Sequence, residues 1–141
     1  MKKLLINLFS LLLASYSFSQ FKQVEKENLI GKVQHFKITE NESIYTCTYT
    51  DIKFKTMNEI KSFNLNKGEF DQLYEIIEKG LNEVPKESVE IENNDLRLSI
   101  EFVKMMGVRS IQITHYDKET GIIGLTSYLT KKQVSKVFGK D

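Results

Sequence analysis

The chain has 141 residues with 20 basic and 19 acidic side chains, which gives a formal net charge of +1 at pH 7. This length suits one small domain, and the balance of charges excludes a polybasic nucleic-acid binder as a description of the whole chain. Hydrophobic residues make up 40% of the chain, which is enough for one core and excludes an acidic disordered tail.

The first 19 residues have the pattern of a signal peptide. Two lysines follow the first Met, an apolar stretch of about 11 residues occupies positions 4–14, and Ser17 and Ser19 are the small residues that signal peptidase requires. We expect cleavage before Gln20 and export to the periplasm or the extracellular space of what the composition indicates to be a bacterium. The apolar stretch is too short to span a membrane, and there is no Cys near the cut, so we expect neither an integral membrane protein nor a lipoprotein.

Residues 20–141 are expected to form a single α+β domain. Removing the two signal-peptide lysines from the 20 basic residues leaves 18 against 19 acidic ones, so the net charge of the exported chain becomes −1. This charge predicts no particular attraction to nucleic acid or to anionic lipid.

Alternating β-forming residues separated by short polar turns predict an antiparallel arrangement of strands. Strands with one apolar face and helices with one apolar stripe must bury these surfaces against each other, which favours a two-layer sandwich. We therefore predict a curved antiparallel sheet of about seven strands in the order βββα-ββββα, with two helices on one face. The expected strands are 32–39, 43–56, 60–65, 88–92, 95–104, 108–116 and 122–129, and the expected helices are 67–82 and 131–138.

Two segments 64 residues apart, 65–74 and 129–138, share one pattern of residue types. In each, a Leu precedes a good N-cap residue, and a Glu or Gln follows the cap by three positions, which predicts a capping box. The similarity has two explanations that the sequence leaves open. One is an internal duplication with halves 31–82 and 88–139, and the other is convergent chemistry at two helix starts.

Cys47 is the only cysteine, so no disulfide can form within the chain and its core must be stabilised by burial. It stands among alternating Thr and Tyr residues, which favours a small buried side chain in a strand. A reactive nucleophile and an intermolecular disulfide are the alternatives.

Local motifs for phosphate, metal or cofactor binding are missing from the sequence, and we expect no cofactor. The only imidazoles are His35 and His115. His115 would share one side of a continued strand with Asp117 and Glu119, which is a possible metal-ligand set. The polar residues around these two acids are typical of a hairpin turn that ends this alternation, so we expect a surface loop and no metal.

Three carboxylates, those of Glu90, Glu92 and Glu101, lie on a predicted hairpin and could converge across it. Arg97 on the same hairpin favours ordinary charge pairing on a solvated face. A small envelope hydrolase or other enzyme, with a non-local site around His115 and this acidic hairpin, is the alternative function that the sequence leaves open.

Tyrosines are the best candidates for a binding surface. If the helices cover one face of the sheet, Tyr45 with Tyr49, or Tyr116 with Tyr128, could form an aromatic patch on the other. The alternative places these tyrosines in the core with their hydroxyls at its rim. The function that we expect is a non-catalytic binding module that uses the open sheet face or an edge strand to bind an unknown protein or a small apolar ligand.

Overall fold

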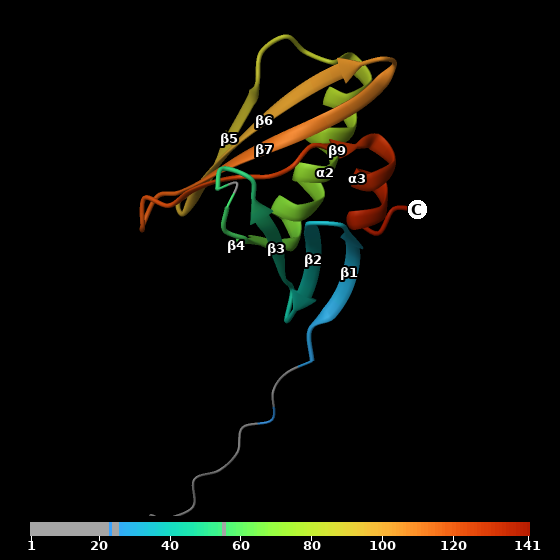
Figure 1. Cartoon of the computed structure of the whole chain (residues 1–141). Helices are drawn as coiled ribbons and strands as arrows, with labels where there is room; N and C mark the ends of the chain where they lie inside the picture. The colour runs from blue at the N-terminus through green and yellow to red at the C-terminus, as the bar shows by residue number, and fades with distance from the viewer. Residues whose placement is uncertain (1–22, 24–25, 55) are drawn as a thin grey trace, which may run out of the picture.

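The computed structural model describes residues 23, 26–54 and 56–141, which form an α+β protein (Figure 1). The signal peptide expected at 1–19 lies outside the described residues. The strands form two antiparallel sheets, one with four strands and one with five. The prediction of a single sheet of about seven strands is therefore wrong.

Sheet 1 is a meander in which each strand pairs with the next one along the chain. The segment 32–39, predicted as one strand, is interrupted by a turn at Gln34 and His35. The residues before this turn belong to an additional strand. The strand predicted at 43–56 ends at Asp51. The side chain of Asp51 accepts hydrogen bonds from the backbone amides of Lys53 and Leu125. The strands are β1 (Asn28–Val33), β2 (Phe36–Asn41), β3 (Ile44–Asp51) and β4 (Glu59–Asn66).

Sheet 2 is dominated by the long hairpin of its second and third strands. The strand predicted at 122–129 is divided in two because the hydroxyl of Thr126 accepts a hydrogen bond from the backbone N–H of Ile113, at 3.0 Å, and interrupts the pairing. The strands are β5 (Val89–Glu92), β6 (Leu96–Met105), β7 (Val108–Asp117), β8 (Ile123–Leu125) and β9 (Leu129–Thr130), and both β8 and β9 pair with β7.

Both helices follow a strand directly and begin with the predicted capping box. In α2 (Lys67–Glu83) the Asn66 side chain accepts from the Glu69 N–H at 2.8 Å, and the Glu69 carboxylate accepts from the Asn66 N–H at 2.9 Å. In α3 (Lys131–Val137) Thr130 and Gln133 make the same reciprocal pair. These bonds satisfy backbone N–H groups that have no partner within the helix.

One apolar core draws side chains from both sheets and both helices. Helix α2 contacts β3 and β4 of sheet 1 as well as β6 and β7 of sheet 2, and α3 contacts strands of both sheets in the same way. The helices therefore join the two sheets through the core. Among the described residues, neither helix is long and apolar enough to cross a membrane.

Asp51 joins the two sheets through hydrogen bonds at the end of β3. Its Oδ1 accepts from the N–H of Lys53 at 2.9 Å and from the N–H of Leu125 in sheet 2 at 3.2 Å, while its Oδ2 accepts from Lys61 at 2.5 Å. Burial by itself raises the pKa of Asp51, but the bonds from Lys61 and the two amides outweigh it, so the pKa lies below its usual value. The buried carboxylate is thus charged and fully partnered.

Replacing Asp51 with Asn should destabilise the fold by about 2 to 3 kcal/mol, because the largely buried Lys61 ammonium would lose its nearest counter-charge and keep only the Glu59 carboxylate, at 3.9 Å. Urea unfolding followed by far-ultraviolet circular dichroism measures the change. The matched control is Asp71→Asn, which removes the carboxylate of the exposed Lys67–Asp71 pair. We expect no measurable change in the control, and equal effects of both substitutions would contradict a special role for Asp51.

Gly80 permits the close approach of α2 to β6. A Cβ at this buried position would overlap the ring of Phe102. Gly80→Ala should therefore lower the stability by about 1 to 2 kcal/mol, although Ala is the better helix former. Gly68→Ala, near the exposed start of the same helix, should leave the thermal midpoint unchanged or raise it slightly. If both substitutions raise the midpoint in differential scanning calorimetry, the helix does not approach the strand as closely as described.

Candidate functional site

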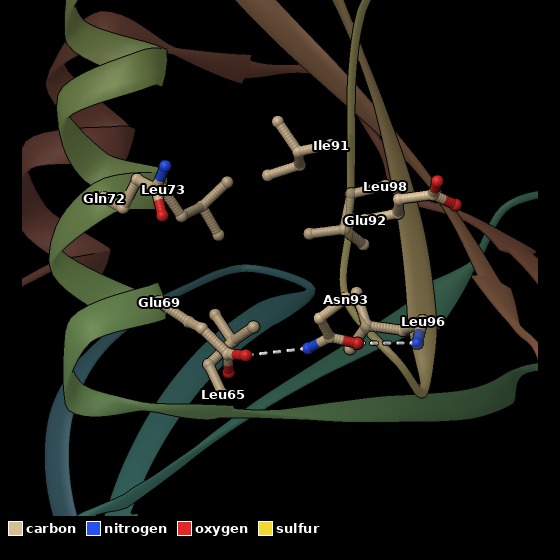
Figure 2. A pocket seen from close by; sticks show the side chains of 9 residues that line it. All are labelled: Leu65, Glu69, Gln72, Leu73, Ile91, Glu92, Asn93, Leu96 and Leu98. Carbon is tan, nitrogen blue, oxygen red and sulfur yellow. Dashed lines mark hydrogen bonds between the residues drawn. The ribbon is translucent and has the colours of Figure 1, made fainter.

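A pocket of about 220 Å³ lies between the first half of α2 and the hairpin of β5 and β6 (Figure 2). We call it the hairpin pocket. Helix α2 and the hairpin are consecutive elements of the chain, and the start of α2 meets the hairpin turn here because α2 contacts both sheets. The lining residues are Leu65, Glu69, Gln72, Leu73, Ile91, Glu92, Asn93, Leu96 and Leu98.

The floor of the hairpin pocket is apolar. Leu73 comes from the core-facing stripe of α2, and Leu96 and Leu98 are alternate residues on the core-facing side of β6. Leu65 and the half-buried Ile91 complete the floor. A surface of this kind favours an apolar guest because contact removes its area from water.

One end of the pocket is closed by a polar bridge from the helix start to the hairpin turn. Besides its bond to the Asn66 amide, the Glu69 carboxylate accepts from the Asn93 side-chain amide at 2.9 Å. The side-chain oxygen of Asn93 in turn accepts from the N–H of Leu96 (Figure 2) and from the N–H of Asp95. Glu69, which belongs to the capping box of α2, therefore also holds the hairpin turn in place.

Glu92, at the rim, is engaged by cations on the outer side of sheet 2. Its carboxylate lies 3.0 Å from the Lys118 ammonium and 3.2 Å from the Arg97 guanidinium. Hydrogen bonds from Lys118 and Arg97 hold the pKa of Glu92 below its usual value. A general acid at neutral pH needs the opposite shift, so Glu92 is not suited to that role.

His115 lies in the core and not in the hairpin pocket. It is buried on β7, where its Nδ1 lies 3.0 Å from the hydroxyl of Tyr49 on β3, across the junction of the two sheets. Burial lowers the pKa of the imidazole; Asp117 opposes this effect and Lys61 adds to it. The residue serves as a buried polar contact between the sheets.

The carboxylates of the alternative hydrolase site do not converge on His115. Glu92 pairs across the sheet with Arg97, and Arg97 pairs with Tyr116, so these residues share the face of sheet 2 opposite to His115. Glu90 accepts a bond from Ser99 on the same outer face. Among the described residues, no group of three or more His, Cys, Asp or Glu side chains could hold a metal ion.

The four candidate tyrosines separate into a buried and an exposed pair. Tyr45 is buried and stacks on Phe70 of α2, with 4.1 Å between ring centroids, and Tyr49 is buried against His115. In this conformation neither offers a surface to a partner. Tyr116, on β7, and Tyr128, between β8 and β9, are exposed and remain candidates for contact with a partner.

Cys47 is fully buried in β3, and burial strongly raises the pKa of its thiol. A thiol in this state is a poor nucleophile. Its position agrees with the interpretation of Cys47 as a small buried side chain.

Sequence reasoning identified Glu69 only as a capping residue and did not identify the hairpin pocket. The pocket residues come from α2, from β4, β5 and β6, and from the turn between β5 and β6, and no local motif connects them. The amphipathic stripe of the helix and the alternation of β6 each predict a buried face, but neither predicts that the faces diverge and leave a space between them.

The lowered pKa of His115 predicts that the protein loses stability in mild acid. The pKa of a free His is about 6.5 and the folded value is lower, so below about pH 6.5 the unfolded chain takes up a proton that the folded chain does not. The wild type should lose stability as the pH falls from about 7 to 5. His115→Asn keeps an acceptor for Tyr49 and removes the titration, so the stability gap between wild type and variant should narrow across this range.

Urea midpoints measured at several pH values test this prediction. His35→Asn, which removes an exposed imidazole from the β1–β2 turn, is the matched control and should show the pH dependence of the wild type. A gap between wild type and His115→Asn that stays constant with pH would show that His115 titrates alike in the folded and unfolded chain.

The hairpin pocket combines an apolar floor with rim carboxylates that already have partners, which suits it to binding a small guest. Its chemistry has to be argued from these residues alone. Comparison with models of protein families, with curated proteins and with solved structures found no match to this chain.

Proposed function

We propose that this chain is an exported, non-catalytic binding module and that the hairpin pocket binds a small, uncharged apolar molecule. The observation that carries the proposal is the apolar floor of Leu65, Leu73, Ile91 and two leucines of β6, which forms the edge of the core where the hairpin pocket reaches the surface. The proposal places binding at the pocket instead of at the open sheet face. Export remains part of it on the strength of the signal-peptide pattern.

The size of the pocket limits the ligand. Its volume of about 220 Å³ exceeds that of the roughly 150 Å³ apolar cavity known to hold benzene. One or two fused rings, or a short branched chain, would fill it. Burying about 200 Å² of such a ligand contributes about 5 kcal/mol, which corresponds to a dissociation constant on the order of 100 μM.

The rim favours a ligand that carries one hydrogen-bonding group and no negative charge. Glu69 places a carboxylate beside the opening, and it would repel an anion, whereas the charge of Glu92 is balanced by Lys118 and Arg97. The amide of Gln72 stands at the same rim, where Figure 2 shows it beside Leu73. An amide can donate to or accept from a hydroxyl or carbonyl on the ligand.

We further propose that the two halves of the chain arose by duplication. Each half has antiparallel strands followed directly by a helix with a capping box. The strand before each helix is placed alike, because Leu65 pairs with Tyr45 of β3 and Leu129 pairs with Ile111 of β7. The number of strands and their breaks differ between the halves, which fits divergence after duplication.

Partly filling the hairpin pocket should weaken binding without unfolding the protein. Ile91→Phe adds a ring at the half-buried edge of the floor, where there is space for it. The neutral fluorophore 6-propionyl-2-(dimethylamino)naphthalene has two fused rings, brightens in an apolar environment and serves as the probe. The wild type should give a saturable increase in emission, and Ile91→Phe should weaken binding by about tenfold, the equivalent of about 1.4 kcal/mol.

The matched control is Ile60→Phe, which adds the same ring at an exposed position of sheet 1 and should bind the probe as the wild type does. Thermal unfolding of both variants establishes that they are folded. Equal binding by wild type and Ile91→Phe, or no saturable signal from the wild type, would remove the pocket as the binding site.

A further inference from the structure

The tip of the β6–β7 hairpin exposes apolar side chains. Met106 is fully exposed, and Met105 and Val108 are 65% and 51% exposed. The hairpin projects beyond the end of α2, at the opposite end of the molecule from β1 and β2 (Figure 1). Three neighbouring apolar side chains at a projecting tip form a surface patch that the folded chain does not cover.

The turn itself is not optimised for the stability of the hairpin. Met106 and Gly107 both have positive φ values, 51° and 81°. Two-residue turns of this kind favour Asn followed by Gly, and a residue with a long side chain is disfavoured at the first position. A fully exposed Met here makes no stabilising contact within the protein, so its presence points to a contact outside the chain.

Basic residues surround the apolar tip. Lys104 and Arg109 are direct cross-strand partners, so two positive charges face each other beside the methionines. Lys131 and Lys132, at the start of α3, line a shallow hollow together with Val108 and Arg109. We call these four residues the basic collar.

Contacts with the end of α2 fix part of the basic collar. Arg109 donates to the carbonyl oxygens of Leu81 and Asn82, each at 3.2 Å, and Lys131 donates to the Asn82 side chain at 3.0 Å. The acids nearest to this region are Glu83, at the end of α2, and Glu101, on β6 three residues before Lys104. The segments 102–116 and 120–140 contain no Asp or Glu.

We propose that the β6–β7 tip docks on a membrane surface that contains anionic lipids. The methionines and Val108 would enter the boundary between headgroups and acyl chains, and the basic collar would lie at the level of the lipid phosphates. Met suits this contact because its flexible side chain adapts to an irregular apolar environment. The interaction is peripheral and does not depend on the hairpin pocket.

The nearly neutral net charge does not oppose this docking. Charges are screened over about 10 Å at 0.1 M salt, so a membrane in contact with the tip responds to the basic collar and only weakly to the acids of more distant elements. The expectation drawn from the net charge, that the chain has no attraction to anionic lipid, therefore holds for the chain as an average and not for this end of it.

Co-sedimentation with vesicles tests the proposal. The full chain is expressed, and mass spectrometry identifies the N-terminus of the purified protein, so that wild type and variants are compared with the same end. Vesicles are made of phosphatidylcholine alone or with roughly 30% phosphatidylglycerol. The wild type should bind the anionic vesicles more tightly than the neutral ones and should be released at high salt.

Met106→Asn separates membrane docking from folding. It creates the favoured Asn-Gly turn, so the thermal midpoint should stay the same or rise, while affinity for anionic vesicles should fall by about tenfold. Lys104→Gln with Lys132→Gln should also weaken binding. The control Lys26→Gln with Lys53→Gln removes two exposed charges, one before β1 and one after β3, and should not.

A fluorescent probe placed at the tip reports insertion directly. The buried Cys47 is shielded from reagent in the folded protein, so Met106→Cys can be labelled with a nitrobenzoxadiazole dye. Its emission should shift to the blue with anionic vesicles, whereas the same dye at Ile60→Cys should not respond. The proposal is overturned if the tip probe does not shift, if Met106→Asn binds as the wild type does, or if the tip instead drives self-association that Met106→Asn abolishes.

Discussion

The buried carboxylate of Asp51 is the interaction on which the relative placement of the two sheets depends. Its donors come from both sides of the junction, Lys53 and Lys61 in the first half of the chain and the Leu125 amide in the second. A buried charge without donors is strongly unfavourable, so the carboxylate requires both halves to be present and aligned. The backbone bond from the Ile52 amide to the Leu125 carbonyl, at 3.0 Å, strengthens the same alignment.

A second polar contact lies beside the first and makes the junction specific. Tyr49 reaches across to His115, and Gly124 of β8 leaves room for the Tyr49 hydroxyl, because a Cβ at that position would overlap it. Apolar contacts alone tolerate small shifts between packed layers, whereas hydrogen bonds with fixed partners do not. With the sheets held in this way, α2 must cross both, and the hairpin pocket lies where it reaches the β5–β6 hairpin.

Whether the sequence could predict a feature depends on how far apart in the chain the interacting residues lie. Capping boxes use residues three positions apart, so both helix starts were predictable from local chemistry. The division into two sheets was not, because β3 ends at a carboxylate whose partner amide is 74 residues away. The inward face of β3 was ambiguous because Tyr and Cys alternate with Thr, and all of these residue types form strands. Tyr45 and Tyr49 are buried because α2 packs on their side of β3, and the residue pattern of β3 alone does not predict where α2 packs.

Glu69 explains why the pocket and the helix start should respond together. One carboxylate oxygen caps α2 and the other holds Asn93, so the helix start and the hairpin turn share a single residue. Local fluctuations that break the bridge would open the pocket and fray the first turn of α2 at the same time. A ligand that binds only the closed arrangement must therefore stabilise the helix start as well, by an amount set by its concentration relative to its dissociation constant. The capping chemistry that the sequence encodes locally thus becomes, through one distant amide, part of the energetics of the pocket.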